Sequence, residues 1–586
     1  MSRLFSFRFS TVMWAAVGLL AAVNLLSLPS CGSAAQTAST ARPDPAAVEI
    51  ASGIRLLQGK EPAAAKLHFS AGIRANPRSA DALTWRGIAE NQLKQYTEAV
   101  RDFEAALHIE PDELPAHYNL ALSLIRLEQA DRAIEQLRIV VKAQPGVLEP
   151  EYNLAVLLEE KHDTVEAIEH LQIAYRAQQN DMGVIQHLLV DLLVAGRAEE
   201  AQPILERVRA EAPAEAKQQV GIALLEAGQF RQAVLLLESV RAQAQPNRES
   251  GLLLARAYIG AQEDSKAIDI LKPTEAADGT GETAYLLGMA YSDTGASEDA
   301  RSAFESAIKA NPRNGRALYH LGLLESVTPE QSSAALRHLR EAMRLEPGNA
   351  AYGIALGKIL LQRDNAQEAM TLLERVHAEA PESAERDLLL GIAQITVSGP
   401  GQAVPVLLRA VAENPSLALP YNMLGFCYFV QGDLTKAVAN YSRASDLSPE
   451  TRIFAHGAAV AFERSNNTDQ AMIYAARAVA LPGANADDHY LLGKLLGKAG
   501  RTEDAIRELN VAITLNPDLE APYYLLARTC SQMGETEKAT EWIARLKELK
   551  QKHEHSYAEN IRNAQSVKSS ALLQGAQIAG PDAQAP

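Results

Sequence analysis

Few of the side chains that do chemistry in proteins stand close together in this chain of 586 residues. The sequence contains neither a glycine-rich phosphate loop nor the nucleophile elbow of serine hydrolases. His553 and His555 flank Glu554, but residues two apart lie on different faces of a helix and do not converge on one metal ion. His187 and His456 each stand alone. We therefore expect no enzymatic activity, no cofactor and no metal site, and we look for function in binding.

The three cysteines are too few for a disulfide framework. We expect Cys427 and Cys530 to be small, buried, apolar side chains. Cys31 has a different setting, because it directly follows an apolar segment near the start of the chain. Its chemistry therefore has to be considered together with that segment.

Residues 1–31 have the pattern of an export signal. Arg3 and Arg8 precede an apolar stretch over residues 11–28, and no acidic residue stands before it. A basic region followed by an apolar one is typical of a secretory signal, and this stretch is also just long enough to cross a bilayer. We expect residues 1–31 to be a signal peptide or a membrane anchor, and the remainder to be exported to the cell envelope, tethered or periplasmic.

The segment Leu28-Pro29-Ser30-Cys31 resembles the lipobox of bacterial lipoproteins, in which a leucine, two small residues and a cysteine mark cleavage and lipid attachment. Pro29 departs from the usual small residue at its position. The resemblance implies that Cys31 is the lipidation site. Two alternatives stay open: cleavage after Ala35 without lipidation, and retention of the segment as an anchor. Residues 32–45 are small and polar with two prolines, and are predicted to form a flexible linker.

The charge of the chain bears on its partners. The formal net charge is −16 and the isoelectric point is about 5.4. Binding of nucleic acid depends on clustered lysine and arginine that neutralise phosphates. We therefore expect no nucleic-acid partner, and we expect the partners to be other proteins.

One alanine recurs at intervals of about 34 residues through most of the chain, which indicates an internal repeat. These register alanines are Ala65, Ala99, Ala133, Ala167, Ala201, Ala233, Ala267, Ala300, Ala335, Ala369, Ala403, Ala437, Ala471, Ala505 and Ala539.

Two further positions keep step with the register alanines. A glycine or alanine precedes the alanine at a constant spacing in nearly every repeat, as Gly288 and Gly425 do, and a proline such as Pro312 or Pro449 follows it. Small residues let two antiparallel helices approach closely, and a larger group would overpack at a cost of about 1–3 kcal/mol. The proline ends the second helix. Each repeat is therefore predicted to be a hairpin of two helices.

These positions match the tetratricopeptide pattern W-x2-L-G-x2-Y, then A-x3-F, then P. Residues 421–449 supply Tyr421-x2-Leu424-Gly425-x2-Tyr428, Ala437-x3-Tyr441 and Pro449. Over residues 46–552 the chain resembles tetratricopeptide repeat proteins, and among them the exported bacterial lipoproteins. The resemblance implies an all-α fold, a solenoid of about fifteen helical hairpins.

The register is interrupted once and then lost. Pro273 falls inside the second helix of the seventh repeat, where a proline costs about 3 kcal/mol or more. We expect a joint there, between an N-terminal block over residues 46–280 and a C-terminal block over residues 281–552. Residues 553–586 leave the register, and we expect this tail to be disordered.

The family resemblance also implies that the first helices of the repeats line a concave binding surface. Tyrosine stands three residues before the small residue in six repeats, and asparagine follows it in two. Tyrosine offers rigid apolar area with a polar tip, and an asparagine row can hydrogen-bond an extended peptide, as similar ladders do in the O-linked sugar transferases. The alternative is that these side chains serve helix packing alone. The predicted groove residues are Tyr118, Asn119, Tyr152, Asn153, His187, Tyr285, Tyr319, Tyr490 and Tyr524.

From these features we expect a scaffold of the bacterial cell envelope that organises an assembly for secretion, pilus formation or polysaccharide export. The alternative is a periplasmic module that binds extended peptides or client proteins in the groove, as a chaperone does. The fold itself does not decide between them, because repeat folds of this kind host many functions.

Overall fold

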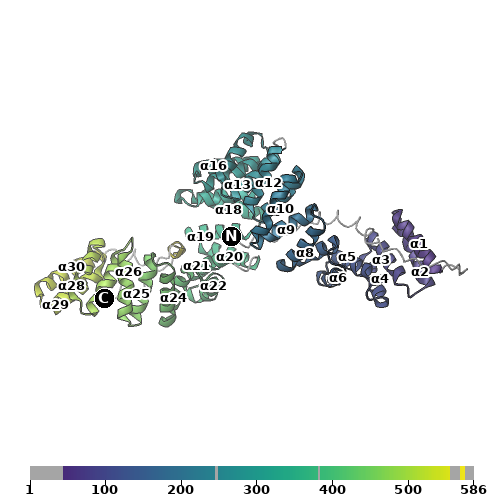
Figure 1. Cartoon of the computed structure of the whole chain (residues 1–586). Helices are drawn as coiled ribbons and strands as arrows, with labels where there is room; N and C mark the ends of the chain where they lie inside the picture. Colours follow the sequence, from purple (N-terminus) through teal and green to yellow (C-terminus); the bar gives the residue numbers. More distant parts are fainter. Residues whose placement is uncertain (1–43, 244–247, 380–382, 555–567, 574–586) are drawn as a thin grey trace. The chain divides into compact units, whose positions relative to one another are not determined.

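The computed structural model describes residues 44–243, 248–379, 383–554 and 568–573 (Figure 1). Within these residues the chain is helical and has no strand, and thirty helices, α1 to α30, follow one another as antiparallel hairpins. The predicted all-α solenoid of tetratricopeptide type is therefore confirmed. The chain divides into two units, residues 1–274 (unit 1) and residues 275–586 (unit 2).

Unit 1 contains α1 (Pro45–Gln58), α2 (Pro62–Ala75), α3 (Ala80–Gln92), α4 (Tyr96–Ile109), α5 (Leu114–Arg126), α6 (Ala130–Ala143), α7 (Leu148–Glu160), α8 (Thr164–Ala177), α9 (Met182–Val194), α10 (Ala198–Glu211), α11 (Ala214–Glu226), α12 (Phe230–Gln243), α13 (Arg248–Gly260) and α14 (Asp264–Leu271). Unit 2 contains α15 (Glu282–Asp293), α16 (Ser297–Ala310), α17 (Gly315–Glu325), α18 (Ser332–Leu345), α19 (Ala350–Gln362), α20 (Ala366–Glu379), α21 (Ala384–Val397), α22 (Pro400–Glu413), α23 (Ala418–Gln431), α24 (Leu434–Leu447), α25 (Arg452–Arg464), α26 (Thr468–Ala480), α27 (Ala486–Lys498), α28 (Thr502–Leu515), α29 (Glu520–Gln532), α30 (Thr536–Glu554) and α32 (Ser569–Leu573). Two short 3-10 helices, η3 (Lys272–Ala277) and η4 (Pro329–Gln331), complete the described elements.

The register alanines form the seam of each hairpin. Most of them are fully buried, and the most exposed, Ala539, is only 6% exposed. The small residue of the first helix is equally constrained: a Cβ atom on Gly425 would lie 2.7 Å from the ring of Tyr441 in the second helix. The hairpins therefore pack through the residues that repeat in the sequence, because only small side chains allow this approach.

The turn inside most hairpins relies on one residue in the left-handed backbone region, five positions before the register alanine. Glycine takes this position in several hairpins, as Gly228 (φ +71°) and Gly432 (φ +81°) do. Elsewhere the chain accepts a residue with a side chain, including Lys94 (φ 60°) and His162 (φ 63°). A glycine here carries no Cβ penalty, so the turn geometry is common to the hairpins although the residue type varies.

The interruption around Pro273 is visible in the structure. Helix α14 has only 8 residues, and the chain continues as the 3-10 helix η3. Proline cannot donate the hydrogen bond that would extend the α-helix. The chain then re-enters the repeat through Asp278, whose carboxylate accepts hydrogen bonds from the backbone N–H groups of Thr280 (2.8 Å) and Thr283 (2.7 Å). The division between the units falls within η3, slightly before the boundary at residues 280 and 281 that the sequence suggested.

The tail differs from its prediction. Helix α30 extends to Glu554, and Ser569–Leu573 form helix α32, which packs on α19 and α21. The predicted disorder of residues 553–586 therefore does not hold for Ser569–Leu573. The reason is that Leu572 buries almost its whole side chain, at 1% exposure, so the segment gains apolar burial that its composition did not suggest.

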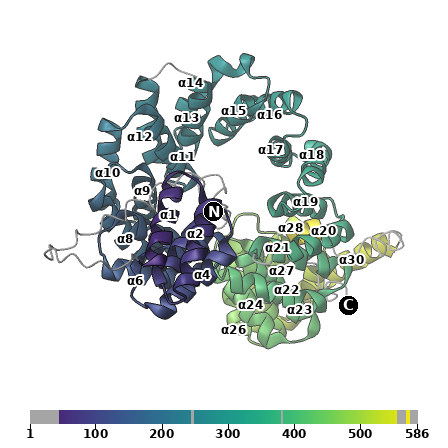
Figure 2. The same cartoon turned by 90° about the vertical axis from the view of Figure 1, so that its right-hand side faces the viewer.

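The first helices, which carry odd numbers from α1 to α29, contact one another from hairpin to hairpin more extensively than the second helices do. They therefore lie on the inner side of the curve within each unit. Figure 2 shows this for the hairpins from α15 to α20, where α15, α17 and α19 lie inside the arc. We call the surface formed by the odd-numbered helices of a unit its first-helix face.

Two predictions concern the N-terminal region. Helix α1 begins at Pro45, the last residue of the predicted linker, because the side chain of Asp44 accepts a hydrogen bond from the N–H of Ala46 (3.1 Å). Cys31 and the rest of the predicted signal and linker, up to residue 43, lie outside the described residues. None of the described helices combines the length and the apolar character needed to cross a membrane.

Candidate protein-binding surface

The predicted groove residues of unit 1 form a row across α5, α7 and α9: Tyr118, Asn119, Tyr152, Asn153 and His187, called here the polar row. The amide nitrogen of Asn153 donates a hydrogen bond to the hydroxyl oxygen of Tyr118 over 3.2 Å. Tyr118 is 3% exposed and Asn153 is 8% exposed. This contact joins the first helices of two successive hairpins, so these two side chains hold the unit together.

The row continues from α7 to α9 through His187. The ring of Tyr152 meets the ring of His187 edge to face, with centroids 5.6 Å apart. The Nδ1 atom of His187 lies 2.7 Å from a carboxylate oxygen of Glu159, which stands about two turns after Tyr152 along α7. His187 is 8% exposed. Ring contact and ion pair together make His187 a second link between first helices.

The pKa values of Asp191 and His187 are shifted from their ordinary values. Burial and the charge of Glu159 raise the pKa of Asp191 to about 7. Burial lowers the pKa of His187, but the hydrogen bond to Glu159 and the charges of Glu159 and Asp191 outweigh it, so the pKa is raised overall. The carboxyl group of Asp191 therefore changes its protonation near neutral pH.

Asn119 has a different role from Asn153. Its amide nitrogen donates to the carbonyl of Pro115 within the same helix, over 2.9 Å. The adjacent hydroxyl of Ser123 donates to the side-chain oxygen of Asn91 on α3 (2.8 Å), and this bond joins the two helices instead. Both predicted asparagines thus use one amide N–H inside the protein. The structure brings the predicted row together, but as a set of contacts between hairpins.

The tyrosines of unit 2 lie in several environments. Tyr285 is 7% exposed, and the guanidinium of Arg316 lies 4.7 Å from its ring centroid. Tyr319 is half-buried and stacks on Tyr352, with centroids 4.8 Å apart. Both arrangements link first helices of adjacent hairpins, α15 with α17 and α17 with α19. They resemble the polar row in connecting hairpins, although the contacts are aromatic.

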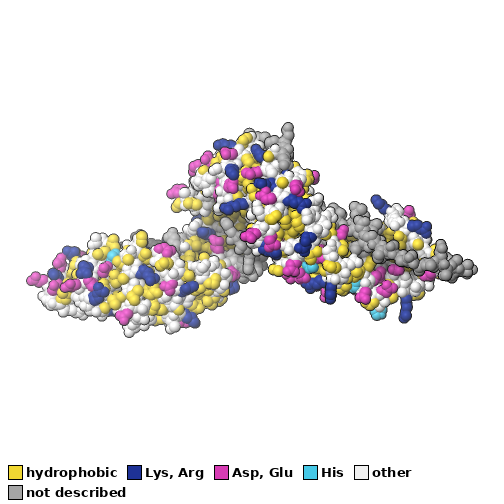
Figure 3. Space-filling view, in the orientation of Figure 1, with side chains coloured by type: hydrophobic (Ala, Val, Ile, Leu, Met, Phe, Trp, Pro, Cys, Tyr) yellow, Lys and Arg dark blue, Asp and Glu magenta, His cyan; other side chains and the backbone are white. Residues whose placement is uncertain are grey.

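Tyr524 is the most accessible of the predicted residues in unit 2. Tyr490 on α27 is half-buried, whereas Tyr524 on α29 is 50% exposed. The visible face over α24 to α28 mixes hydrophobic side chains with charges of both signs (Figure 3). Exposed tyrosine in a mixed surface is typical of protein interfaces.

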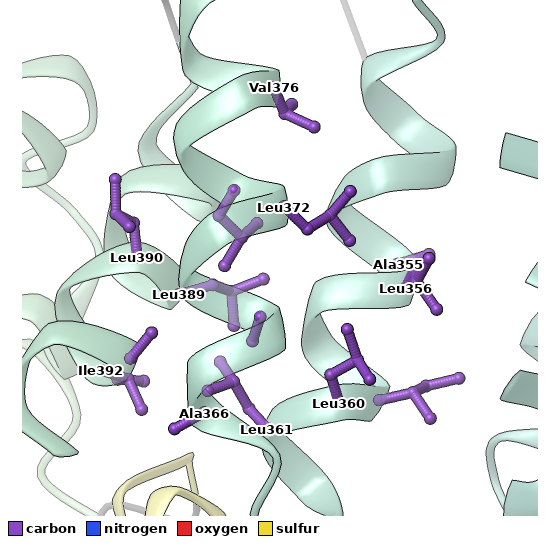
Figure 4. Packing of buried hydrophobic residues seen from close by; sticks show 14 of the residues in the cluster. Ala355, Leu356, Leu360, Leu361, Ala366, Leu372, Val376, Leu389, Leu390 and Ile392 are labelled. Carbon is purple, nitrogen blue, oxygen red and sulfur yellow. The ribbon is translucent and has the colours of Figure 1, made fainter. Parts of the chain in front are cut away.

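A further surface was not predicted. Buried leucine and isoleucine side chains of α19 and α21 pack together with those of α20 between them (Figure 4), and Leu572 of α32 belongs to the same cluster. Helix α32 contacts the first helices α19 and α21. We call this part of the first-helix face the α32 surface. Leu361 and Ile395 stand four positions after the small residue in two consecutive repeats, but unit 1 has apolar residues at the same position, so the pattern alone does not identify this surface.

Two observations concern chemistry. Cys427 and Cys530 are free and buried, and burial raises the pKa of the Cys427 thiol to about 12. Within the described parts of the chain, no group of three or more His, Cys, Asp or Glu side chains is arranged to hold a metal ion.

These elements together define an α-solenoid built from helical hairpins. Sequence profiles described as tetratricopeptide repeat match residues 90–157, 224–290 and 330–392, and a second such profile matches residues 50–113, 285–325 and 428–488. The chain belongs to the tetratricopeptide repeat family. A profile described as anaphase-promoting complex, cyclosome, subunit 3 matches residues 464–546.

Two relatives align with part of the chain. Tetratricopeptide repeat protein 37 of Xenopus laevis is 25% identical over 244 residues, which are 39% of this chain and 16% of that protein. Superkiller complex protein 3 of Mus musculus is 24% identical over 176 residues, which are 28% of this chain and 11% of that protein. The chain thus spans less than a fifth of the length of either relative.

Solved structures also align with this one. The crystal structure of the APC/C hetero-tetramer Cut9–Hcn1 matches with a TM-score of 0.38 and 13% identity, covering 77% of this chain and 96% of that chain. The structure of Naa15/Naa10 bound to HypK-THB matches with a TM-score of 0.29 and 14% identity, covering 87% of this chain and 94% of that chain.

Proposed function

We propose that this protein is a protein-interaction scaffold of the bacterial cell envelope, where it holds together an assembly such as a secretion, pilus or polysaccharide-export apparatus. The observation that carries the interaction role is the exposure of Tyr524 (50%) on the first-helix face of unit 2, beside the half-buried Tyr490 of the preceding first helix. Accessible tyrosines are frequent anchors of protein interfaces, and truncating one costs about 2 kcal/mol or more of binding energy where it is a hot spot. Superkiller complex protein 3, by its name a component of a complex, is consistent with this role.

The interaction role is tested by capture of partners from detergent-solubilised membranes, followed by mass spectrometry. Tyr490→Ala with Tyr524→Ala should reduce capture by at least tenfold, because loss of 1.4 kcal/mol weakens binding tenfold. Ile473→Ala on the second helix α26 is the matched control, since Ile473 is 54% exposed. Equal yields from the double variant and the control would contradict a partner site on this part of the first-helix face.

The envelope location is a separate part of the proposal, and the sequence pattern of residues 1–31 supports it. We propose that the protein is exported and lipidated at Cys31, which would tether the hairpins to a membrane. Cys31→Ser should then move the protein from the membrane fraction to the soluble fraction, or leave an uncleaved precursor of higher mass. Unchanged fractionation together with unchanged mass would favour cleavage without lipidation or a retained anchor.

A periplasmic client-binding module is the second candidate, and the docking of α32 on the first-helix face favours it. A chaperone-like module binds many extended segments with little regard to sequence, whereas a scaffold selects its partners. Binding measured across a panel of unrelated unfolded peptides separates the two functions. Comparable affinities across the panel would favour the client-binding module, and binding of few or none would favour the scaffold.

A further inference from the structure

Helix α32 is a bound segment on the first-helix face of unit 2. It contacts α19 and α21, the first helices of two adjacent hairpins. Ser569 and Leu572 are 0% and 1% exposed, and Leu573 is half-buried against the same cluster. The segment lies outside the repeat register and reaches this surface from the far end of the chain. Its burial shows that the surface accepts a helix that is not part of any hairpin.

The polar contact at this surface has a clear physical basis. The hydroxyl of Ser569 donates a hydrogen bond to the carbonyl oxygen of Leu361 over 2.8 Å. Helix α19 ends at Gln362, and the last carbonyls of a helix lack partners within the helix. Asp364 supplies one backbone N–H to the same oxygen (3.1 Å), and Ser569 adds a second donor. A hydroxyl at this position of a bound segment is therefore recognised by an exposed helix end.

The apolar contact follows from the spacing of the segment. Leu572 stands three residues after Ser569, so both side chains lie on one face of α32. Leu361 and Ile395 occupy equivalent positions on α19 and α21, and they are 0% and 2% exposed. The closest equivalent in unit 1 is the run Leu193, Leu225 and Ile259, of which the first and last remain half-buried. The residues at this position, four after the small residue of the repeat, are thus fully buried where α32 is docked.

We propose that the α32 surface is a binding site for a short helical segment that carries a hydroxyl side chain followed three and four residues later by two leucines. The chain's own Ser569–Leu573 is the resident ligand of this site. A partner protein with a segment of the same chemistry binds by displacing it. This inference goes beyond the scaffold role and depends on α32 alone, so it can stand or fail independently of the tyrosines tested above.

Displacement is physically reasonable because α32 is short. A helix of five residues is not stable on its own and forms only while it is docked. Helix α32 belongs to the same chain as the surface that it contacts, and this covalent connection raises its effective concentration there. A partner held at the same assembly also gains a high local concentration. The tail therefore acts as a competitor that excludes weak or dilute segments and yields to a tethered partner.

The test uses a fluorescein-labelled synthetic peptide of residues 563–578 and the full chain, with binding followed by fluorescence anisotropy. The unaltered chain should bind the peptide weakly, because its own tail fills the site. Leu572→Asp in the chain should release the tail, and this chain should bind the peptide at least tenfold more tightly. Leu515→Asp is the matched control: Leu515 is 51% exposed on α28, and this chain should bind the peptide as the unaltered chain does.

A second peptide tests whether binding depends on the leucine side chain of the peptide. The same peptide with Leu572→Asp should fail to bind the Leu572→Asp chain, and this comparison requires no change in the surface itself. Equal binding of the original peptide to the unaltered and Leu572→Asp chains, or no binding to either, would overturn the proposal. Equal binding of the two peptides to the Leu572→Asp chain would overturn it as well.

Discussion

The polar row of unit 1 and the α32 surface of unit 2 occupy equivalent places in the fold. Both lie on the first helices of adjacent hairpins, α5 to α9 in one case and α19 with α21 in the other. In the polar row, side chains of successive hairpins bind one another, as Asn153 binds Tyr118 and Glu159 binds His187. On the α32 surface, apolar side chains of two hairpins are covered by a segment from the tail.

This difference shows that residue type alone does not identify a binding surface in a repeat protein. Tyrosine and asparagine suit peptide recognition, but in unit 1 much of their hydrogen-bonding capacity is used between hairpins. Leucine and isoleucine suit a buried core, but on α19 and α21 they extend beyond what the hairpins themselves cover. The polar row therefore behaves as structure, and the α32 surface as a site with an occupant.

The largest expected effect tests the structural role of the polar row. Tyr118→Ala removes a buried ring and leaves the amide of Asn153 without its acceptor. Replacing a buried aromatic residue by alanine typically costs about 3–5 kcal/mol, and we expect this loss in the local stability of α5 to α8. Hydrogen exchange of these helices measures it.

Two controls accompany the Tyr118 variant. Tyr118→Phe keeps the ring and should cost only about 1 kcal/mol for the hydrogen bond. Tyr524→Ala, at the same repeat position but 50% exposed, should change stability by less than about 0.5 kcal/mol. A small effect of Tyr118→Ala would mean that the row is not structural, and it would restore the groove hypothesis for unit 1.

The next effect concerns the α32 surface. Leu572→Ala should weaken the docking of α32 by about 2 kcal/mol, since burying a leucine contributes about 1.5–3 kcal/mol. Amide exchange of Ser569–Leu573 should become fast, while the hairpins of unit 2 keep their protection. Loss of protection throughout α19 to α22 would instead show that the tail is part of the core of the hairpins and not a separable ligand.

A smaller expected effect is a change of folding stability with pH, and it arises at the polar row. The pKa of Asp191 is raised to about 7 in the folded chain, above its ordinary value of 3.8. The folded state therefore holds this proton more tightly than the unfolded state, and the stability that the proton contributes is lost as pH rises towards 7. The raised pKa of His187 acts in the same direction.

Asp191→Asn isolates this contribution, because the amide cannot ionise. The variant should match the unaltered chain near pH 5 and exceed it at pH 8. One pKa unit corresponds to about 1.4 kcal/mol, and since the carboxyl is partly accessible we expect a difference of about 1–2 kcal/mol after screening. Thermal melting at the two pH values measures it. A difference that is the same at both pH values would show that the effect is not one of ionisation.

The sequence predicted the hairpins well because the constraint is local and repeated. A small residue is required wherever the two helices of a hairpin cross. Ala65 and Ala505 are therefore buried in equivalent contacts of two different hairpins. Pro273 predicted the interruption for an equally local reason. The tail was not predicted, because nothing in the composition of residues 553–586 indicates that Leu572 meets helices some two hundred residues earlier in the chain.

The candidate site was predicted only in part, because accessibility depends on the neighbouring hairpin. Tyr118 and Tyr524 hold the same repeat position, yet they are 3% and 50% exposed. Helix α7 covers the first through Asn153, whereas the second lies on α29, and within the described residues no first helix follows α30 in the register. The repeat pattern predicts the position of a side chain on its own helix. Its exposure depends also on the side chain that packs against it from the next repeat, and that residue is specified elsewhere in the sequence.

The smallest expected effect separates the two asparagines. Asn153→Ala removes a hydrogen bond between α7 and α5 and should cost about 1 kcal/mol. Asn119→Ala removes only a bond to Pro115 in its own helix, and because alanine favours the helix by a few tenths of a kcal/mol, we expect a net change close to zero. Chemical denaturation of both variants, with partner capture measured alongside, completes the comparison. Stability loss confined to Asn153→Ala, with capture intact in both, fits a row that works as structure. Capture lost in Asn119→Ala at unchanged stability would contradict it, since that side chain could then act only through a bound partner.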